Sequence, residues 1–237
     1  MIIMVANNKK GLKESFAKVF ENPNRINFKE LLQDIHGEYD ELDFKQEYID
    51  DSKLAKHILG MANSGGGAII FGVEEKEEGC LTPTGLDNFK DTTDIKKELS
   101  KFLPFELEYE IYNFEYEDDN EWKTVKNKKF QLMIIEYTPW NIPFLSKADG
   151  KNIKRKDIYC RKNSSTTKVD YEDLKKILDI RIDDGMNNNK NTFDEDIDQI
   201  ETLYLYFERY KYLSNLYFTQ YLKRLINKKR RIIEDKL

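Results

Sequence analysis

The chain has 237 residues, of which 39% are hydrophobic, 13% aromatic and 35% charged. This length and this supply of aromatic residues exclude a disordered chain and are sufficient for one large domain with an appendage. The net charge of -5 excludes a chain that binds polyanions over its whole surface, so any nucleic-acid-binding surface must be a local patch.

The spacing of apolar residues predicts helices and strands in turn along the chain. Helices are predicted at residues 11–20, 27–37, 51–64, 92–103 and 170–182. Strands are predicted at residues 42–49, 68–75, 106–116, 130–139 and 156–163. We therefore expect an α+β fold, in which helices flank a mixed β-sheet.

The composition also divides the chain into segments. Residues 183–196 are rich in Asn, Asp and Gly and almost lack apolar residues, which is typical of a linker. Before this linker we expect an α+β domain at residues 30–182, preceded by an N-terminal helical segment at residues 1–29. After it, residues 197–237 have helical periodicity and are predicted to form a C-terminal helical element.

The C-terminal element is predicted to be one long helix or a helical hairpin. Ser214 and Asn215 could cap a second helix and so break the run in two. A stripe of tyrosines along this segment is typical of ordinary packing. We nevertheless interpret it as a docking or dimerisation element, and we expect a homodimer whose basic tail, residues 223–231, adds an electrostatic contact.

Three consecutive glycines, Gly65 to Gly67, lie between a predicted helix and a predicted strand. A phosphate-binding P-loop has the opposite order, strand then loop then helix, and ends in Lys-Ser or Lys-Thr, which is absent here. The order and the missing lysine exclude an ATPase of the P-loop type. We interpret the glycines as the end of the helix and a sharp entry into the strand, with a loop that admits a nucleic-acid backbone or partner chain as the alternative.

Cysteine and histidine are scarce and widely spaced. The chain has Cys80, Cys160, His36 and His57, and their spacing matches no zinc motif. We therefore expect no zinc site, and free thiols in a reducing compartment. The N-terminus lacks the layout of a signal peptide and no apolar run reaches the ~20 residues of a membrane span, so we expect a cytoplasmic protein with no membrane contact.

Three sequence stretches occur in an order that resembles the Schlafen AlbA_2 domain family. They are GEYDELDFKQE, HILGMANSGGGAIIFGVEE and DIYCRKNSSTT, and the resemblance covers roughly residues 30–182. The matching positions are Glu38, Asp43, Phe44, Lys45, Asn63, Gly66, Gly67, Gly72, Val73, Glu74, Glu75, Arg161, Asn163, Ser164, Ser165 and Thr166. The ordered combination is specific, although no single stretch is.

The resemblance implies a nucleic-acid-binding fold. Some members of the family cleave transfer and ribosomal RNA at a metal site made of three carboxylates, and others are DNA-binding regulators. Carried over to this sequence, the metal ligands are Glu38, Asp43 and Glu74 or Glu75, with Lys45 as the accompanying cation. The chain departs from the family at Asp43, where Glu is usual, and the shorter side chain puts the metal geometry in question.

Carboxylates near two strand ends could bind Mg²⁺ or Mn²⁺, both of which prefer oxygen ligands, and such a metal can activate water against a phosphodiester. Strand alternation places Glu74 and Glu75 on opposite faces, so only one of them is expected to point into the site. The alternative is that these carboxylates are ordinary solvated surface groups of an acidic chain.

A basic segment is the second indication of nucleic-acid binding. The predicted contact residues are Lys151, Lys154, Arg155, Lys156, Arg161, Lys162, Ser164, Ser165 and Thr166. Cations of this kind bind phosphates, and the hydroxyl groups could add hydrogen bonds. The alternatives are a solvated loop for the cations and turn or N-cap chemistry for the hydroxyl residues.

The sequence thus predicts a nucleic-acid-binding protein, with three hypotheses about its activity. The first is a metal-dependent endoribonuclease that acts on structured RNA such as transfer RNA, since no motif for base readout is present. The second is a non-catalytic DNA- or RNA-binding regulator with the same fold. The third is a protein-interaction module.

Overall fold

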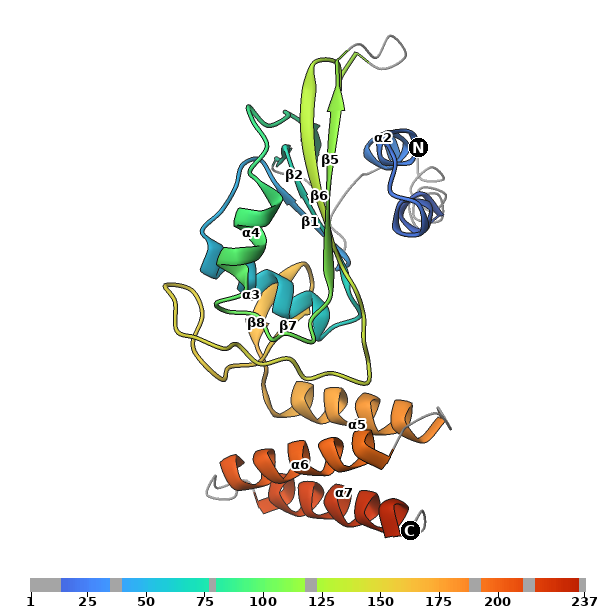
Figure 1. The fold of residues 1–237 in the computed structure, drawn as a ribbon, viewed down its shortest axis with the longest axis vertical. Helices are drawn as coiled ribbons and strands as arrows, with labels where there is room; N and C mark the ends of the chain where they lie inside the picture. Colours follow the sequence, from blue (N-terminus) through green and yellow to red (C-terminus); the bar gives the residue numbers. More distant parts are fainter. Residues whose placement is uncertain are drawn as a thin grey trace, which may run out of the picture. The chain divides into compact units, whose positions relative to one another are not determined.

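The computed structural model describes residues 14–34, 40–76, 80–117, 123–187, 193–210 and 216–234 (Figure 1). By its internal contacts the chain divides into two compact units, Met1–Val169 and Asp170–Leu237. None of the helices in the described ranges is long and apolar enough to cross a membrane.

The first unit is built on a four-stranded sheet with the strand order β1-β2-β6-β5. Its strands are β1 (Leu42–Lys45), β2 (Gly67–Phe71), β5 (Tyr109–Tyr116) and β6 (Lys128–Ile135). β1 runs parallel to β2, whereas the β2–β6 and β6–β5 pairs are antiparallel. The predicted α+β fold with a mixed sheet is confirmed.

Helix α2 (Arg25–Asp34) and a helical segment at residues 14–21 lie on one face of this sheet. Figure 1 shows α2 on the opposite side from α3 and α4. Phe28 of α2 stacks on Phe114 of β5, with ring centroids 4.4 Å apart. Leu42 and Phe44 of β1 belong to the same apolar cluster. Because strand side chains alternate, the residues between and after them, Asp43 and Lys45, point to the other face.

The other face is covered by α3 (Asp51–Ala62) and α4 (Thr92–Leu99). The Asp50 side chain caps α3 by accepting hydrogen bonds from the amides of Ser52 and Lys53, at 3.0 and 3.2 Å. A carboxylate at this position satisfies backbone amides that the first turn of a helix leaves without partners. Ile58 and Met61 are fully buried, which fixes the rotation of α3 on the sheet.

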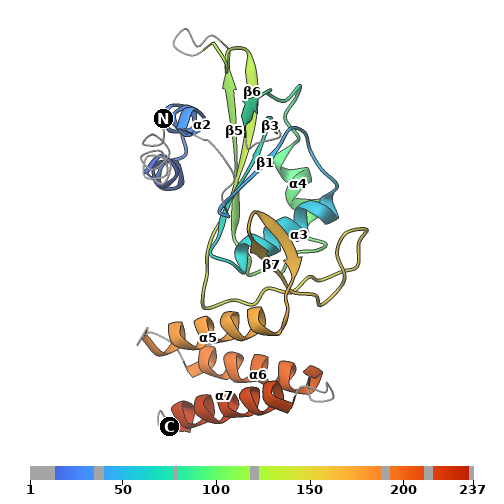
Figure 2. The ribbon, with the colours of Figure 1, turned by 180° about the vertical axis from the view of Figure 1, so that it is seen from behind.

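Two small antiparallel sheets complete the first unit. One pairs β3 (Val73–Glu75) with β4 (Leu81–Pro83), and the other pairs β7 (Tyr159–Lys162) with β8 (Ser165–Lys168). The β7–β8 turn consists of Asn163 and Ser164, both with positive φ, 46° and 61°. This is the turn that matches the twist of a tight hairpin. β7 packs against α3, as the view from behind shows (Figure 2).

Several element boundaries differ from those predicted. The strand predicted at 42–49 ends at Lys45, and the strand predicted at 68–75 is divided by Gly72 into β2 and β3. Residues 165–168, interpreted as a turn and helix cap, form strand β8. The hydroxyl residues Ser165, Thr166 and Thr167 are exposed, half-buried and exposed in turn, which is the two-residue period of a strand. Because all three are polar, this period does not appear as a hydrophobic pattern in the sequence.

The glycines after α3 have the structural role that the sequence predicted. Gly65 to Gly67 all have positive φ. A Cβ on Gly67 would lie 2.5 Å from the carbonyl oxygen of Glu41, whereas one on Gly65 would meet nothing within 4 Å. Gly67 is therefore required by close backbone packing beside β1, and Gly65 only by its backbone conformation.

The second unit contains α5 (Tyr171–Asn187), α6 (Phe193–Tyr210) and α7 (Leu216–Glu234). α6 and α7 are separate helices that pack on each other, so the C-terminal element is a hairpin and not one long helix. Tyr206 is buried, and the Tyr221 hydroxyl donates to Asp179 of α5. These two tyrosines of the predicted stripe serve internal packing.

The division between units differs from the predicted domain boundary. We expected the helix at 170–182 to close the α+β domain and residues 183–196 to form a linker. The contacts instead group α5 with the C-terminal helices. α5 also continues to Asn187, into the predicted linker.

Candidate functional site

The three sequence stretches that carry the family resemblance meet beside β1. The backbone amide of Arg161 on β7 donates to the Ser64 hydroxyl after α3, at 2.8 Å. The Arg161 side chain reaches β1, where Nη2 donates to the Leu42 carbonyl at 2.7 Å. In the hairpin turn, the Ser164 amide donates to the Asp40 carboxylate at 2.6 Å. Residues 97 to 124 positions apart are thus joined by hydrogen bonds that involve side chains.

Asp43 lies at the centre of this junction and is only 7% exposed. Its Oδ1 is 2.7 Å from Lys45 Nζ and 3.6 Å from Arg161 Nη2, and its Oδ2 is 3.3 Å from His57 Nδ1 of α3. Thr166 Oγ1 of β8 is 3.3 Å from the same His57 nitrogen. We call these five residues, Asp43, Lys45, His57, Arg161 and Thr166, the Asp43 cluster.

The charge balance of the Asp43 cluster is set by a neutral histidine. Burial lowers the pKa of His57 to about 4, against the opposing effect of the Asp43 carboxylate, and Lys45 and Arg161 lower it further. At neutral pH the cluster therefore holds one carboxylate and two cations. The Arg161 side chain is 2% exposed, so this charge is inside the protein and not on the predicted phosphate-binding surface.

Asn63, which belongs to the stretch that contains the three glycines, also has a structural role. Its side-chain amide donates to the carbonyls of Phe144 and Tyr159, at 3.0 and 2.9 Å, and its oxygen accepts from the Phe144 amide at 2.7 Å. Every polar atom of this buried side chain faces a backbone partner. Asn63 fixes the end of α3 to β7 and to the loop before it.

The carboxylates predicted at the end of the second strand lie on β3. Glu74 has a side chain that is 36% exposed and pairs with Lys76, at 3.6 Å, whereas Glu75 is exposed. Strand alternation holds, since Glu74 and Glu75 pair with successive residues of β4. No hydrogen bond or ion pair described in the structure joins either side chain to Asp43.

The residues described do not by themselves fit a divalent metal. Within the described ranges, no three or more His, Cys, Asp or Glu side chains form a group that could hold an ion. Asp43 already faces two cations, and cations beside a carboxylate compete with a metal for its oxygens. The third predicted ligand, Glu38, lies outside the described residues.

The predicted basic segment is largely on the surface. Lys151, Lys154, Arg155, Lys156 and Lys162 are exposed, in contrast to Arg161. Of the predicted hydroxyl contacts, Ser165 is exposed, Ser164 is half-buried in the turn and Thr166 is half-buried against His57. The predicted contact residues thus include five exposed cations and one exposed serine.

The basic loop is fixed to α3 and to an aromatic ring. The Asn152 amide donates to the Ser52 hydroxyl at 3.1 Å, and the Lys154 amide donates to the Tyr159 hydroxyl at 3.2 Å. Lys56 of α3 lies 5.4 Å from the Tyr159 ring centroid, in cation–π range. α3 therefore adds Lys56 to the cations beside this loop.

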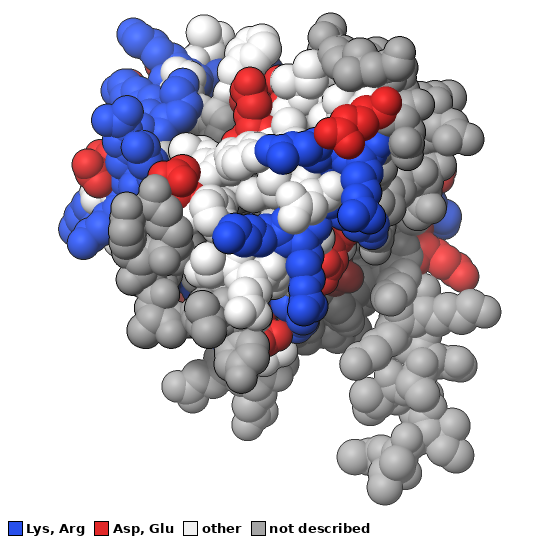
Figure 3. Space-filling view, turned by 90° about the horizontal axis from the view of Figure 1, so that it is seen from below, with Lys and Arg blue, Asp and Glu red and all other residues white. Residues whose placement is uncertain are grey.

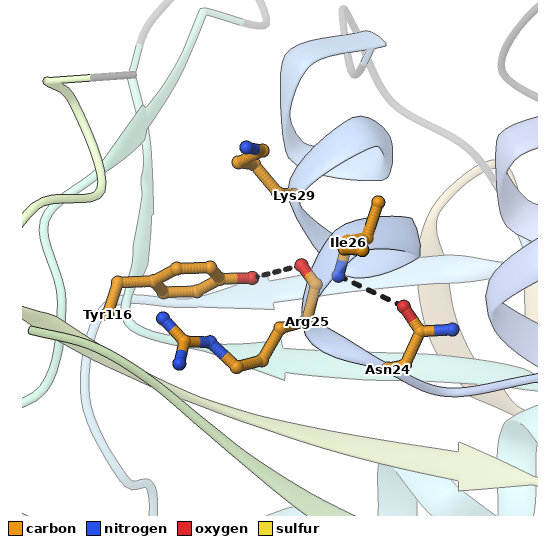
Figure 4. A pocket seen from close by; sticks show the side chains of 5 residues that line it. All are labelled: Asn24, Arg25, Ile26, Lys29 and Tyr116. Carbon is orange, nitrogen blue, oxygen red and sulfur yellow. Dashed lines mark hydrogen bonds between the residues drawn. The ribbon is translucent and has the colours of Figure 1, made fainter. Parts of the chain in front are cut away.

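The first unit has a further pocket, and the second unit has a basic surface. On the α2 face, a cavity of about 560 Å³ is lined by Asn24, Arg25, Ile26, Lys29 and Tyr116, where Arg25 covers the Tyr116 ring (Figure 4). In the second unit, the basic tail at 223–231 lies on α7, and the view onto that side shows Lys and Arg around an uncharged strip (Figure 3). Neither surface contains a predicted site residue of the first unit.

His57 and Lys56 were not predicted to contribute to the site. The available signal was the polar sequence of α3, where Lys53, Lys56, His57 and Gly60 fall on one helical face. A Cβ on Gly60 would lie 2.6 Å from Thr166 Cγ2, so that face is where β8 approaches most closely. A glycine in mid-helix beside polar residues marks such an approach.

Comparison with known proteins agrees with the motifs that meet at this junction. No curated protein matches the chain significantly. The sequence model of the family described as Schlafen, AlbA_2 matches residues 38–170, which is more than half of the chain and includes all three stretches around Asp43. On this match, the chain belongs to the Schlafen AlbA_2 family.

Proposed function

We propose that this protein binds structured RNA through the exposed basic loop and hairpin beside α3. The observation that supports the proposal is the set of exposed cations at Lys151, Lys154, Arg155, Lys156 and Lys162 in a protein with a net charge of -5. A local patch of this kind attracts phosphates even when the whole molecule is acidic.

The shape of the patch favours backbone contacts over base readout. Four of its five cations, Lys151, Lys154, Arg155 and Lys156, lie in the loop before β7 and not along a helix that could enter a groove. Lys56 and the Tyr159 ring add a cation and an aromatic group at its base. We expect contacts with phosphates and sugar hydroxyls of a folded RNA, with weak dependence on its sequence.

Binding is tested with a labelled transfer-RNA-like hairpin, a DNA duplex and a single-stranded RNA, measured by fluorescence anisotropy at several salt concentrations. For the double variant Lys154→Ala/Arg155→Ala we expect affinity for the RNA hairpin to fall roughly tenfold or more at low salt, and the salt slope to fall by about two. The matched control is Lys96→Ala/Lys97→Ala, which removes two exposed cations from α4. Unchanged binding by the first variant at low salt would contradict the proposal.

Metal-dependent cleavage of the bound RNA is the second candidate. It is favoured by the position of β3. The Gly72 amide donates to the Lys45 carbonyl at 2.8 Å, so β3, which carries Glu74, begins beside the end of β1, which carries Asp43. The described residues do not assemble the metal ligands, so the candidate requires Glu38 and Mg²⁺ or Mn²⁺ to complete a site.

The cleavage assay separates this candidate from a non-catalytic regulator. Pure protein is incubated with labelled transfer RNA and Mg²⁺ or Mn²⁺, with EDTA as the blank. Cleavage that is lost in Glu38→Gln and Glu74→Gln, while RNA binding survives, supports the nuclease. Intact binding without cleavage of any RNA or DNA substrate supports the regulator.

A homodimer, expected from the C-terminal element, is part of the same proposal. Leu205 of α6 is 60% exposed and is a large apolar side chain that a second copy could cover. The RNA-binding patch does not depend on this pairing.

A further inference from the structure

We propose that Asp43 is a structural anchor, which holds the β7–β8 hairpin on β1 and α3, and that it is not a metal ligand in this chain. The inference stands apart from RNA binding, since it concerns how the first unit is held together.

The hairpin needs such an anchor because it lies outside the main sheet. β7 and β8 pair only with each other among the described strands, so no backbone ladder joins them to β1. Side chains make that connection instead. Arg161 reaches the Leu42 carbonyl and the Asp43 carboxylate, and Thr166 reaches His57.

Asp43 is the carboxylate that faces both cations of this connection, whereas the Asp40 carboxylate binds the hairpin turn through the Ser164 amide. The Arg161 guanidinium is buried, and its Nε and Nη1 have no hydrogen-bond partner there. The Lys45 ammonium is 2.7 Å from Asp43 and also donates to the Phe44 carbonyl at 3.1 Å. Without the Asp43 charge, two cations would be left in a poorly solvated place, where uncompensated charge is costly.

A metal ligand would have the opposite surroundings. Carboxylates that share an ion repel one another when the ion is absent, and this repulsion destabilises the metal-free protein. Asp43 instead has cations on Oδ1 and a histidine nitrogen beside Oδ2. Removing the Asp43 charge should therefore lower the stability of the metal-free protein if Asp43 is an anchor, and should raise it if Asp43 is a metal ligand.

The test is the melting temperature of Asp43→Asn without metal. Asparagine keeps the size of the side chain and removes its charge. For an anchor we expect a fall of about 10 °C, because the buried Arg161 and the half-buried Lys45 lose their counter-charge. The matched control is Glu74→Gln, a half-exposed ion-paired carboxylate, for which we expect a change within about 2 °C.

The same measurement with Mn²⁺ or Mg²⁺ completes the test. For an anchor, any rise in melting temperature on adding metal to the wild type is also present in Asp43→Asn. The proposal is overturned if Asp43→Asn melts at or above the wild type without metal, or if it abolishes a metal-induced rise that the wild type shows.

A second variant keeps the proposal testable if Asp43→Asn does not fold. Lys45→Met removes one of the two cations and leaves Arg161 in place. We expect a smaller fall in melting temperature and no gain in Mn²⁺ affinity by titration calorimetry. A metal-binding carboxylate relieved of a neighbouring cation would bind Mn²⁺ more tightly, and that result would also overturn the proposal.

Discussion

At the scale of single residues, the neutral state of His57 is the feature with the clearest consequence. Its side chain is 15% exposed, and it lies between Asp43 and Thr166. Burial dominates its titration, and the neighbouring Lys45 and Arg161 also disfavour a proton there. The folded protein therefore binds a proton at His57 only under acidic conditions, whereas the unfolded chain binds one near the ordinary histidine pKa.

The expected result is a loss of stability as pH falls from about 6.5 to about 4. The folded pKa is below the unfolded one, so the unfolded state gains the proton first and the free energy of unfolding falls, by about 3 kcal/mol over this window. Urea unfolding at a series of pH values checks this. The part of the loss due to His57 is the part that disappears in His57→Gln, and parallel curves for the two proteins would show that the histidine has no such effect.

At the scale of elements, the glycines after α3 decide whether β2 can lie beside β1. The Ala68 amide donates to the Glu41 carbonyl at 2.8 Å, and Gly67 lies against that same carbonyl. A side chain at position 67 would push the two strands apart where their parallel pairing begins.

Gly67→Ala is expected to lower the free energy of unfolding by about 3 kcal/mol, because both the contact and the backbone conformation oppose a side chain. Gly65→Ala has only an unfavourable φ, 108°, and should lower it by about 1 kcal/mol. Chemical denaturation of both variants measures the difference. Equal losses would mean that the close packing at Glu41 can relax.

The elements also show what the sequence could predict and why the rest was hidden. Helix α3 was predictable because its apolar residues repeat with the helical period, and β6 was predictable because it is a nearly continuous apolar run of strand length. The hairpin strand β8 was not, because it consists of hydroxyl residues and a lysine. The meeting of Asp43, His57 and Arg161 was also hidden, since their contacts are long-range and no local pattern encodes them.

The site predictions divide in the same way. Arg161 was expected on the surface as one of a run of cations, but a run in sequence does not show which member turns inward. Asp43 was expected from the family resemblance, and the structure places it among cations whose positions depend on the fold.

At the scale of the whole molecule, an acidic net charge is compatible with the proposed RNA binding because the charges are segregated on the surface. The net charge is -5, yet the proposed RNA-binding patch on the loop before β7 and the β7–β8 hairpin contains five exposed cations. Strand β5 and its flanks contribute Glu108, Glu110 and Glu115, which are exposed. RNA attracted to the basic patch would be repelled from that strand, so the charge distribution favours one docking direction.

The two cations around Asp43, Lys45 and Arg161, also affect the edge of the sheet that is formed by β1. The carbonyls of Glu41 and Lys45 accept hydrogen bonds from the amides of Ala68 and Gly72, on the side of β2. The alternate carbonyls, those of Leu42 and Phe44, point away from β2 and accept from Arg161 and Lys45 side chains. The outer edge of β1 is thus closed to a strand from another molecule.

Removing both donors should open this edge to self-assembly. For Lys45→Met/Arg161→Met we expect species larger than those of the wild type, growing with protein concentration, in size-exclusion chromatography with light scattering. Lys96→Met/Lys97→Met adds the same apolar side chains on α4 and should elute as the wild type does. Identical elution of both variants would mean that something else protects the edge. On this view, the Arg161 side chain that holds the hairpin on β1, together with Lys45, also keeps separate copies of the protein from joining strand to strand.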